Sequence, residues 1–161
     1  MSFFVYEVLR QPDILAKLRA ELDTNIPSDV TVPPLEQVDL PYLNMILKET
    51  LKYSSTGFGT FRTCSFDTEM EGVVLPANTT AALCNPAVHR DPTLWDDPDT
   101  FDPERWRPGQ GLSTLVMTLT LATLFRQFDL TLESGFEMEY LPSFTLRPKN
   151  GLPVRAVRRR S

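Results

Sequence analysis

Few side chains in this sequence have the type and spacing that chemistry requires. Glu49 and Lys52 are three positions apart in an apolar stretch, so on a helix they share a face and can form an ion pair. Cys64 and Cys84 have neither metal-site nor disulfide-framework spacing, and we expect both to be buried, reduced thiols. His89 is the only histidine, and we expect a structural role for it. The sequence shows no Ser-His-Asp set, phosphate loop or metal cluster.

The charge of the chain excludes several classes of partner. The formal net charge is −5, which predicts neither a nucleic-acid surface nor an anionic-membrane surface. Arg155 and the arginines at 158–160 form a local basic tail, which we expect to be solvated. No stretch reaches the roughly 20 apolar residues of a membrane span, and no signal peptide is indicated. A turn-rich acidic run, also expected to be solvated, comprises Asp96, Asp97, Asp99 and Asp102.

One helix must position Glu49 and Lys52. Pro41 stands where a proline in the first helical turn costs no hydrogen bond. After it, apolar residues recur with the helical period at Leu43, Ile46, Leu47 and Leu51. We therefore predict an amphipathic helix over residues 40–53 that buries one face in a core.

The rest of the chain, long enough for a single domain over residues 1–161, divides into short elements. We predict two helices over residues 1–22, with Asp13 as the N-cap of the second. Strands are predicted over residues 60–83, turning at Gly72 and at 76–78, and an aromatic-rich ordered coil over residues 84–108. Residues 112–128 favour a helix by their length, although part of them alternates like a strand. Short alternating runs broken by prolines predict an antiparallel hairpin over residues 140–158.

Two segments together resemble one known family. The stretch Leu40–Tyr53 is similar to the K helix of cytochromes P450, whose pattern is Glu-x-x-Arg, and Phe101–Trp106 is similar to that family's P-E-R-W/F segment. The resemblance implies a buried structural network of Glu49, Lys52 and Arg105. It also implies an α+β, P450-like fold, mainly helices with small antiparallel β hairpins. Lys52 replaces the family's arginine and lacks its planar fork, so we expect a looser network.

The resemblance extends over most of the chain. Residues 1–22 look like the end of the I helix and the J helix, and residues 60–83 like the β region after the K helix. Residues 84–108 look like the stretch leading through the meander, 112–128 like the L helix, and 140–158 like the C-terminal β hairpin. We expect the chain to cover roughly the C-terminal third of such a fold. Apolar faces that the missing parts would cover should then be exposed, namely Leu43, Ile46, Leu47, Leu115, Leu119 and Ala122.

The family's cofactor is haem, held by an axial cysteine thiolate. By resemblance, Arg62 lies where a family arginine contacts a haem propionate, although a solvent-exposed strand arginine is an equally good interpretation. The loop that carries the axial cysteine, Phe-x-x-Gly-x-Arg-x-Cys-x-Gly, is absent, because 107–111 runs directly into Leu112. Neither Cys64 nor Cys84 occupies the family's position. We therefore expect no metal-ligating residue and at most weak haem binding.

Two hypotheses for function follow. By descent the chain resembles a haem-thiolate monooxygenase of small apolar substrates, served by a P450 reductase. The segment Leu121–Phe128 is similar to P450s of fungal secondary metabolism, which suggests a secondary metabolite as substrate. The alternative is a non-catalytic remnant or a partner-binding fragment, and the missing cysteine loop favours it. As written the chain is expected to be cytoplasmic, whereas full-length family members are often anchored to the endoplasmic reticulum.

Overall fold

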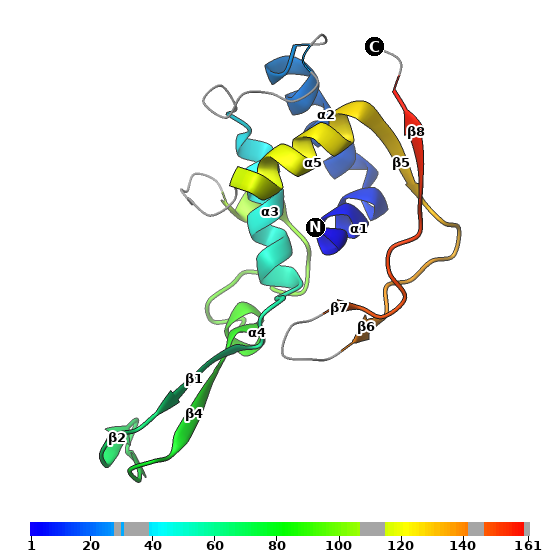
Figure 1. Ribbon diagram of the computed structural model, residues 1–161. Helices are drawn as coiled ribbons and strands as arrows, with labels where there is room; N and C mark the ends of the chain where they lie inside the picture. Colours follow the sequence, from blue (N-terminus) through cyan, green and yellow to red (C-terminus); the bar gives the residue numbers. More distant parts are fainter. Residues whose placement is uncertain (28–29, 31–38, 107–114, 142–146, 160–161) are drawn as a thin grey trace.

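The helices pack into one body from which a β arm projects (Figure 1). The computed structural model describes residues 1–27, 30, 39–106, 115–141 and 147–159. Four long helices, α1 (Ser2–Arg10), α2 (Pro12–Asn25), α3 (Pro41–Tyr53) and α5 (Leu115–Gln127), supply most of the core. None of the described helices is both long and apolar enough to cross a membrane.

Helix α3 forms where the apolar period predicts it, one residue shorter than the predicted range. Leu43, Ile46 and Leu47 are buried, which gives the helix its core-facing side. The N-terminus of α3 is capped by a residue of another helix. The Glu21 carboxylate on α2 accepts hydrogen bonds from the backbone N–H groups of Tyr42 (2.6 Å) and Leu43 (2.9 Å). An anion at this end satisfies unpaired donors and complements the helix dipole.

The break between α1 and α2 lies at Gln11 and Pro12. Gln11 adopts an extended conformation and Pro12 opens α2 at its first turn. The prediction of Asp13 as N-cap was therefore wrong, since Asp13 lies inside the first turn of α2. Pro12 lacks an N–H that would be unpaired there in any case, which explains why the helix begins at it.

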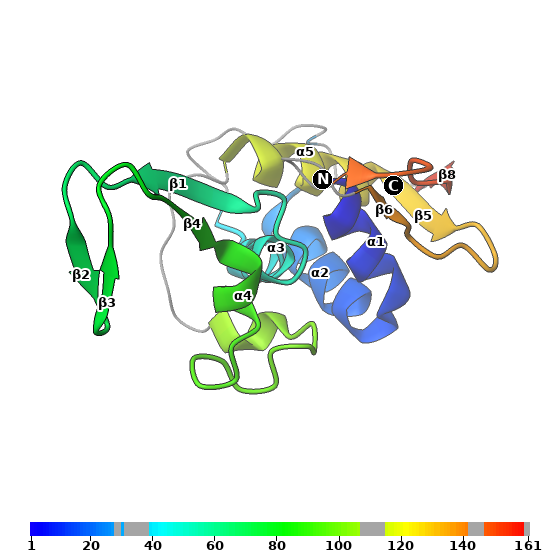
Figure 2. The ribbon, with the colours of Figure 1, turned by 90° about the horizontal axis from the view of Figure 1, so that it is seen from below.

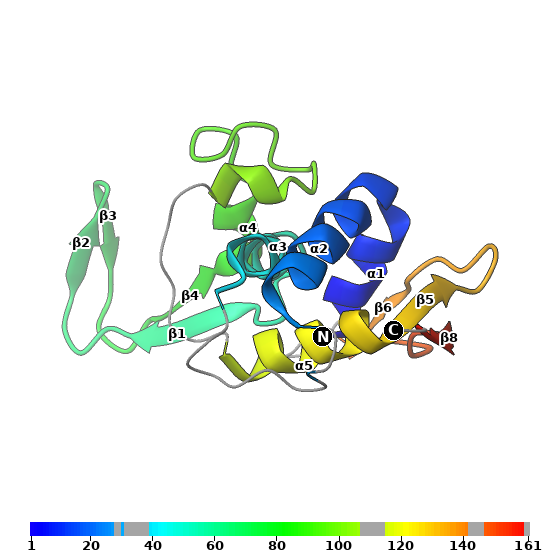
Figure 3. The same cartoon turned by 90° about the horizontal axis from the view of Figure 1, so that it is seen from above.

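The β arm, defined as residues 59–84, consists of two nested antiparallel pairs. Strand β1 (Gly59–Thr63) pairs with β4 (Thr80–Cys84), and between them β2 (Thr68–Met70) pairs with β3 (Val73–Leu75). Each strand thus pairs within its own ladder, and the turn at 76–78 connects β3 to β4 without pairing them. The β arm extends away from the helices in all the views (Figures 1, 2 and 3).

The segment predicted as coil over 84–108 contains two short helices, α4 (Asn85–His89) and the 3₁₀ helix η2 (Pro103–Trp106). Both lie beside α3, and η2 begins where the Asp102 carboxylate accepts the backbone N–H of Glu104 at 2.9 Å. This cap explains why the proline-rich run turns back onto α3.

The C-terminal region differs from its prediction. Strand β8 (Val154–Arg158) pairs antiparallel with β5 (Phe128–Leu132), which follows α5 directly, while β6 (Tyr140–Leu141) pairs with β7 (Arg147–Pro148). The single hairpin predicted over residues 140–158 was therefore wrong. Residues 142–146 and the 107–114 junction, including the start of the helix predicted over 112–128, lie outside the described residues.

The apolar helix faces expected to be exposed are covered. Leu43, Ile46, Leu47 and Ala122 are at most 2% exposed, so that expectation was wrong for them. The side chains of Leu115 and Leu119 lie outside the described set. Packing of α2 and α5 against α1 and α3 buries these faces within the chain itself, in one continuous cluster.

Candidate functional site

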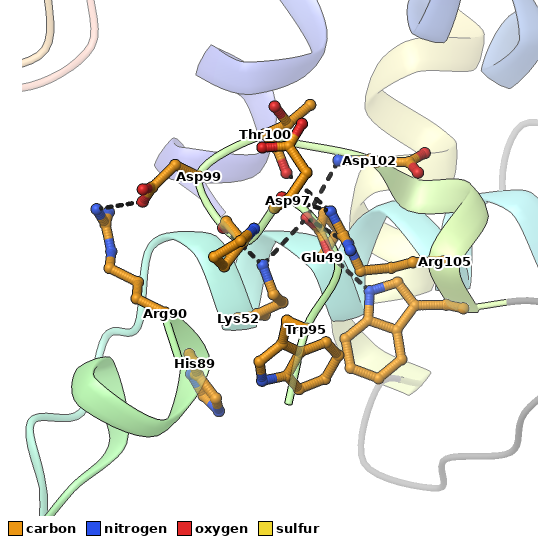
Figure 4. A network of polar contacts seen from close by, with 12 residues as sticks. Glu49, Lys52, His89, Arg90, Trp95, Asp97, Asp99, Thr100, Asp102 and Arg105 are labelled. Atoms are coloured by element: carbon orange, nitrogen blue, oxygen red, sulfur yellow. Dashed lines mark hydrogen bonds and ion pairs between the residues drawn. The ribbon is translucent and has the colours of Figure 1, made fainter. Parts of the chain in front are cut away.

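The Glu49 carboxylate lies at the centre of a buried polar network. Glu49, on α3, is 0% exposed. Its Oε1 accepts hydrogen bonds from Arg105 Nε at 3.2 Å and from the backbone N–H of Asp102 at 3.1 Å, and its Oε2 accepts one from Trp106 Nε1 at 2.8 Å. Figure 4 shows Arg105 and Asp102 directed toward Glu49 on α3. A buried carboxylate needs such donors to remain charged.

Arg105 connects this carboxylate to the preceding loop. Its Nη1 donates to the carbonyl of Asp96 at 2.7 Å, and its Nη2 donates to the carbonyls of Asp97 and Thr100, both at 3.1 Å. One planar guanidinium thus binds three loop carbonyls and Glu49 at the same time. We call Glu49, Lys52, Asp102, Arg105 and Trp106 the Glu49 network.

Lys52 contacts both Glu49 and the loop that Arg105 binds. It is 3% exposed, and its Nζ lies 3.7 Å from Glu49 Oε1 and donates to the carbonyl of Pro98 at 2.9 Å. The ammonium also lies 5.3 Å from the centre of the Trp95 ring. Burial lowers the pKa of Lys52, Glu49 raises it again in part, and Arg105 lowers it. The structure therefore brings together Glu49, Lys52 and Arg105, the trio that the resemblance implied.

Sequence reasoning missed two members of the network. The indole N–H of Trp106 donates a hydrogen bond to Glu49, and the backbone N–H of Asp102 donates another. The sequence carried one signal for Trp106, since a buried indole N–H usually has a partner. The backbone donor carries no sequence signal, because every residue except proline has one.

His89 has a structural environment. Its Nδ1 lies 2.6 Å from the Ser55 hydroxyl, and its ring packs edge-on against Trp95, whose own N–H donates to the carbonyl of Val88. Burial and the nearby Lys52 lower the pKa of His89. These contacts fix the end of α4 against α3. No group of three or more His, Cys, Asp and Glu side chains suited to a metal ion occurs among the described residues.

Arg62 lies on β1 of the β arm, opposite Ala81, with an exposed side chain. Its Nη1 donates to the carbonyl of Phe61 at 3.1 Å. The structure thus places Arg62 apart from the Glu49 network, and its contact with a haem propionate stays a prediction. In the acidic run, Asp99 is exposed and pairs with Arg90, as a solvated face would.

The thiols available in this chain do not fit an axial haem ligand. Cys64 and Cys84 are both half-buried, where full burial was expected, and both belong to the β arm. The backbone of Cys64 is bonded to Thr79 and Asn78, and Cys84 ends β4 opposite Gly59. The sequence between Trp106 and Leu115 contains no cysteine. No residue between Trp106 and the start of α5 can therefore supply a thiolate ligand.

The family of this chain is visible in both sequence and fold. A family model described as cytochrome P450 matches residues 1–113. Cytochrome P450 81D1 of Arabidopsis thaliana is 28% identical over 176 residues, covering 98% of this chain and 35% of that protein. Probable cytochrome P450 12d1 distal, mitochondrial, of Drosophila melanogaster is 41% identical over 98 residues, covering 60% of this chain and 19% of that protein.

The structural likeness extends through the C-terminal strands. A solved structure described as retinoic acid bound cyanobacterial CYP120A1 superimposes with a TM-score of 0.84 at 28% identity, covering 98% of this chain and 41% of that one. The predicted α+β fold with small antiparallel hairpins is confirmed. The chain spans about a third of the length of the Arabidopsis relative, 35% of it.

Proposed function

Since this chain belongs to the cytochrome P450 family, we propose that it is a non-catalytic member that keeps the family's scaffold without its thiolate chemistry. In this proposal the role of the Glu49 network is to stabilise the fold. It anchors the loop 96–102 and η2 on α3, and it offers neither a nucleophile nor an open metal position. Its buried carboxylate accepts hydrogen bonds from Arg105, Asp102 and Trp106, which suits a structural role.

One observation carries the proposal: there is no cysteine between Trp106 and Leu115. In a haem-thiolate enzyme the axial sulfur supplies the electron density that favours O–O cleavage. Cys64 and Cys84 lie on the β arm and do not substitute for it.

The ancestral activity is proposed from the family alone. It is haem-dependent monooxygenation of a small apolar substrate, with electrons from a P450 reductase. A secondary metabolite is the proposed substrate class, and the fungal likeness stays part of this proposal, since the relatives described above are plant and insect proteins.

A carbon monoxide spectrum tests the proposal. The protein is titrated with haemin, reduced and exposed to carbon monoxide. We expect no red-shifted Soret band of thiolate ligation, whether in the native chain or in the Cys64→Ser and Cys84→Ser variants. A variant with a cysteine-bearing loop inserted between Gly111 and Leu112 is the positive control. A stoichiometric thiolate band from the native chain overturns the proposal, and its loss in one cysteine variant would identify the ligand.

One observation favours the related proposal of a partner-binding role. The tip of the β arm exposes apolar side chains, with Phe66 72%, Val74 62% and Val73 60% exposed. Its two ladders have only two strands each among the described residues, so their outer edges are open. The expected occupant is a strand of a second copy, and sedimentation of the native chain against a Val73→Lys, Val74→Lys variant tests it. A monomer in both cases removes this role.

A further inference from the structure

A cavity of about 480 Å³ opens between α1, the end of α3 and the segment before β6. This volume lies in the range of ordinary small-molecule sites. Aromatic rings and hydroxyl groups form much of its wall, and Glu7 lies on its α1 side. Its lining residues include Tyr6, Glu7, Tyr53, Ser54, Met138 and Tyr140.

Glu7 is a buried carboxylate without a partner. It is 4% exposed, and its carboxylate forms no hydrogen bond or ion pair within the described part of the chain; Gln11 bonds only to its backbone carbonyl. Arg10, one helical turn away, lies over the Tyr6 ring at 5.1 Å. Burial raises the pKa of Glu7, and the positive charge of Arg10 only partly opposes this. Such a group costs stability unless something else pairs with it.

The cavity also contains hydroxyl groups that can accept hydrogen bonds. The Ser54 hydroxyl, on a residue 4% exposed, and the Tyr140 hydroxyl line the same space. Burial raises the pKa of Tyr140, Ser54 opposes part of the rise through a hydrogen bond, and the charge of Glu7 adds to the rise. A primary ammonium has three N–H donors, which match one carboxylate and two hydroxyl oxygens.

We propose that this cavity is a binding site for a small organic monoamine, whose ammonium group pairs with Glu7. The aromatic walls hold the apolar body of the ligand. The site is preformed, because Tyr140 stacks on Phe3 at 5.5 Å between ring centres and the Tyr6 hydroxyl accepts the backbone N–H of Met138 at 3.2 Å. A preformed site binds without the cost of ordering its own walls.

Other charged side chains also line the cavity, namely the guanidinium groups of Arg10 and Arg90 and the carboxylate of Glu137. Arg90 lies 5.8 Å from the centre of the Tyr53 ring and pairs with Asp99 at 3.0 Å. Glu137 is exposed, whereas Glu7 is buried, so Glu7 is the carboxylate that gains more from an ammonium partner.

Titration calorimetry of the native 161-residue chain tests the site. The probe is 2-phenylethylamine, and 2-phenylethanol is its uncharged counterpart. We expect one amine per chain and at least about tenfold weaker binding of the alcohol, the usual effect of losing a charge-assisted hydrogen bond. Equal binding of amine and alcohol, or binding of neither, overturns the proposal.

Two variants test whether Glu7 is the residue that pairs with the ammonium group. Glu7→Gln keeps the side-chain shape and is expected to weaken amine binding at least about tenfold. Glu139→Gln removes the same charge from an exposed residue that pairs with Lys149, and it is expected to leave binding unchanged. Far-UV circular dichroism checks that both variants are folded. If both bind the amine as the native chain does, Glu7 is not the ammonium partner and the proposal fails. The test needs no haem, so it stands apart from the proposed function.

Discussion

Glu49 on α3 and Arg105 on η2 meet at 3.2 Å in the buried network, although 56 positions separate them in the chain. The contact joins the helix to the loop that passes over it, and the side chains are 0% and 12% exposed. The packing of the segment 96–106 against α3 depends on this contact.

Replacing Glu49 with glutamine should destabilise the fold strongly. Lys52 and Arg105 would lose the buried anion that they share, and breaking a buried ion pair costs about 3–5 kcal/mol. Urea unfolding followed by Trp fluorescence measures the change. Glu69→Gln, on the exposed strand β2, is the matched control and should change the unfolding free energy little. A Glu49→Gln variant as stable as this control would show that the network carries no net stability.

Replacing Arg105 with lysine should also destabilise the protein, by about 2 kcal/mol. A single ammonium cannot reach Glu49 and the carbonyls of Asp96, Asp97 and Thr100 at the same time. Arg147→Lys, on the exposed end of β7, makes the same chemical change at a surface site. Equal midpoints of urea unfolding for the two variants would contradict this prediction.

Replacing Glu7 with glutamine should stabilise the protein at pH 7. Burial raises the folded-state pKa of Glu7 above its ordinary 4.5, so the fold favours the protonated form. That contribution is complete below pH 4.5 and is lost as the pH rises through the folded-state pKa. The gain from the variant should therefore shrink as the pH falls toward 4.

Urea midpoints at pH 7 and pH 4 measure this effect, with Glu139→Gln as the control. Glu139 is exposed and pairs with Lys149, so its replacement should give no such pH-dependent gain. A Glu7→Gln variant less stable than the native chain at pH 7 would mean that the Glu7 carboxylate has a stabilising partner.

Replacing Gly59 with alanine should loosen the β arm. Gly59 has a φ of +152°, and an added Cβ would meet the carbonyl oxygen of Leu83 at 1.7 Å. The clash acts on the first rung of the β1–β4 ladder and should cost at least about 2 kcal/mol. Gly57→Ala is the control, because its Cβ would meet nothing within 4 Å.

Hydrogen exchange of the Asn85 amide is the local measurement, since this N–H donates to the carbonyl of Phe58 at 2.9 Å beside Gly59. Exchange should accelerate in Gly59→Ala and stay unchanged in Gly57→Ala. Equal protection in the two variants would show that the strands accommodate the extra methyl group.

Local pattern was sufficient for the helix that carries the site. The period of Leu43, Ile46 and Leu47 predicted α3 and its buried side, and the three-residue spacing placed Glu49 and Lys52 on one face. Helical hydrogen bonds join residues four apart, so the information for a helix lies within its own sequence.

Strand pairing was the part that local pattern left undetermined. The alternating run at Val154–Arg158 was recognised as a strand, but its partner β5 was not predicted, and only its first residue, Phe128, falls within the helix predicted over 112–128. Ladder hydrogen bonds join segments far apart in the chain, and only the packing of α5 on α2 places Phe128–Leu132 beside β8.

The same distinction between local and long-range information applies to the Glu49 network and to the cavity beside Glu7. The sequence determined the absence of a cysteine after Trp106 and the Glu49–Lys52 pairing, because residue type and short spacing decide both. The tertiary structure alone decided that Trp106 binds Glu49 and that Glu7 faces a cavity beside Tyr140. Each of these contacts joins residues more than 50 positions apart, and their meeting depends on how the helices and loops pack together, which no short window of sequence contains.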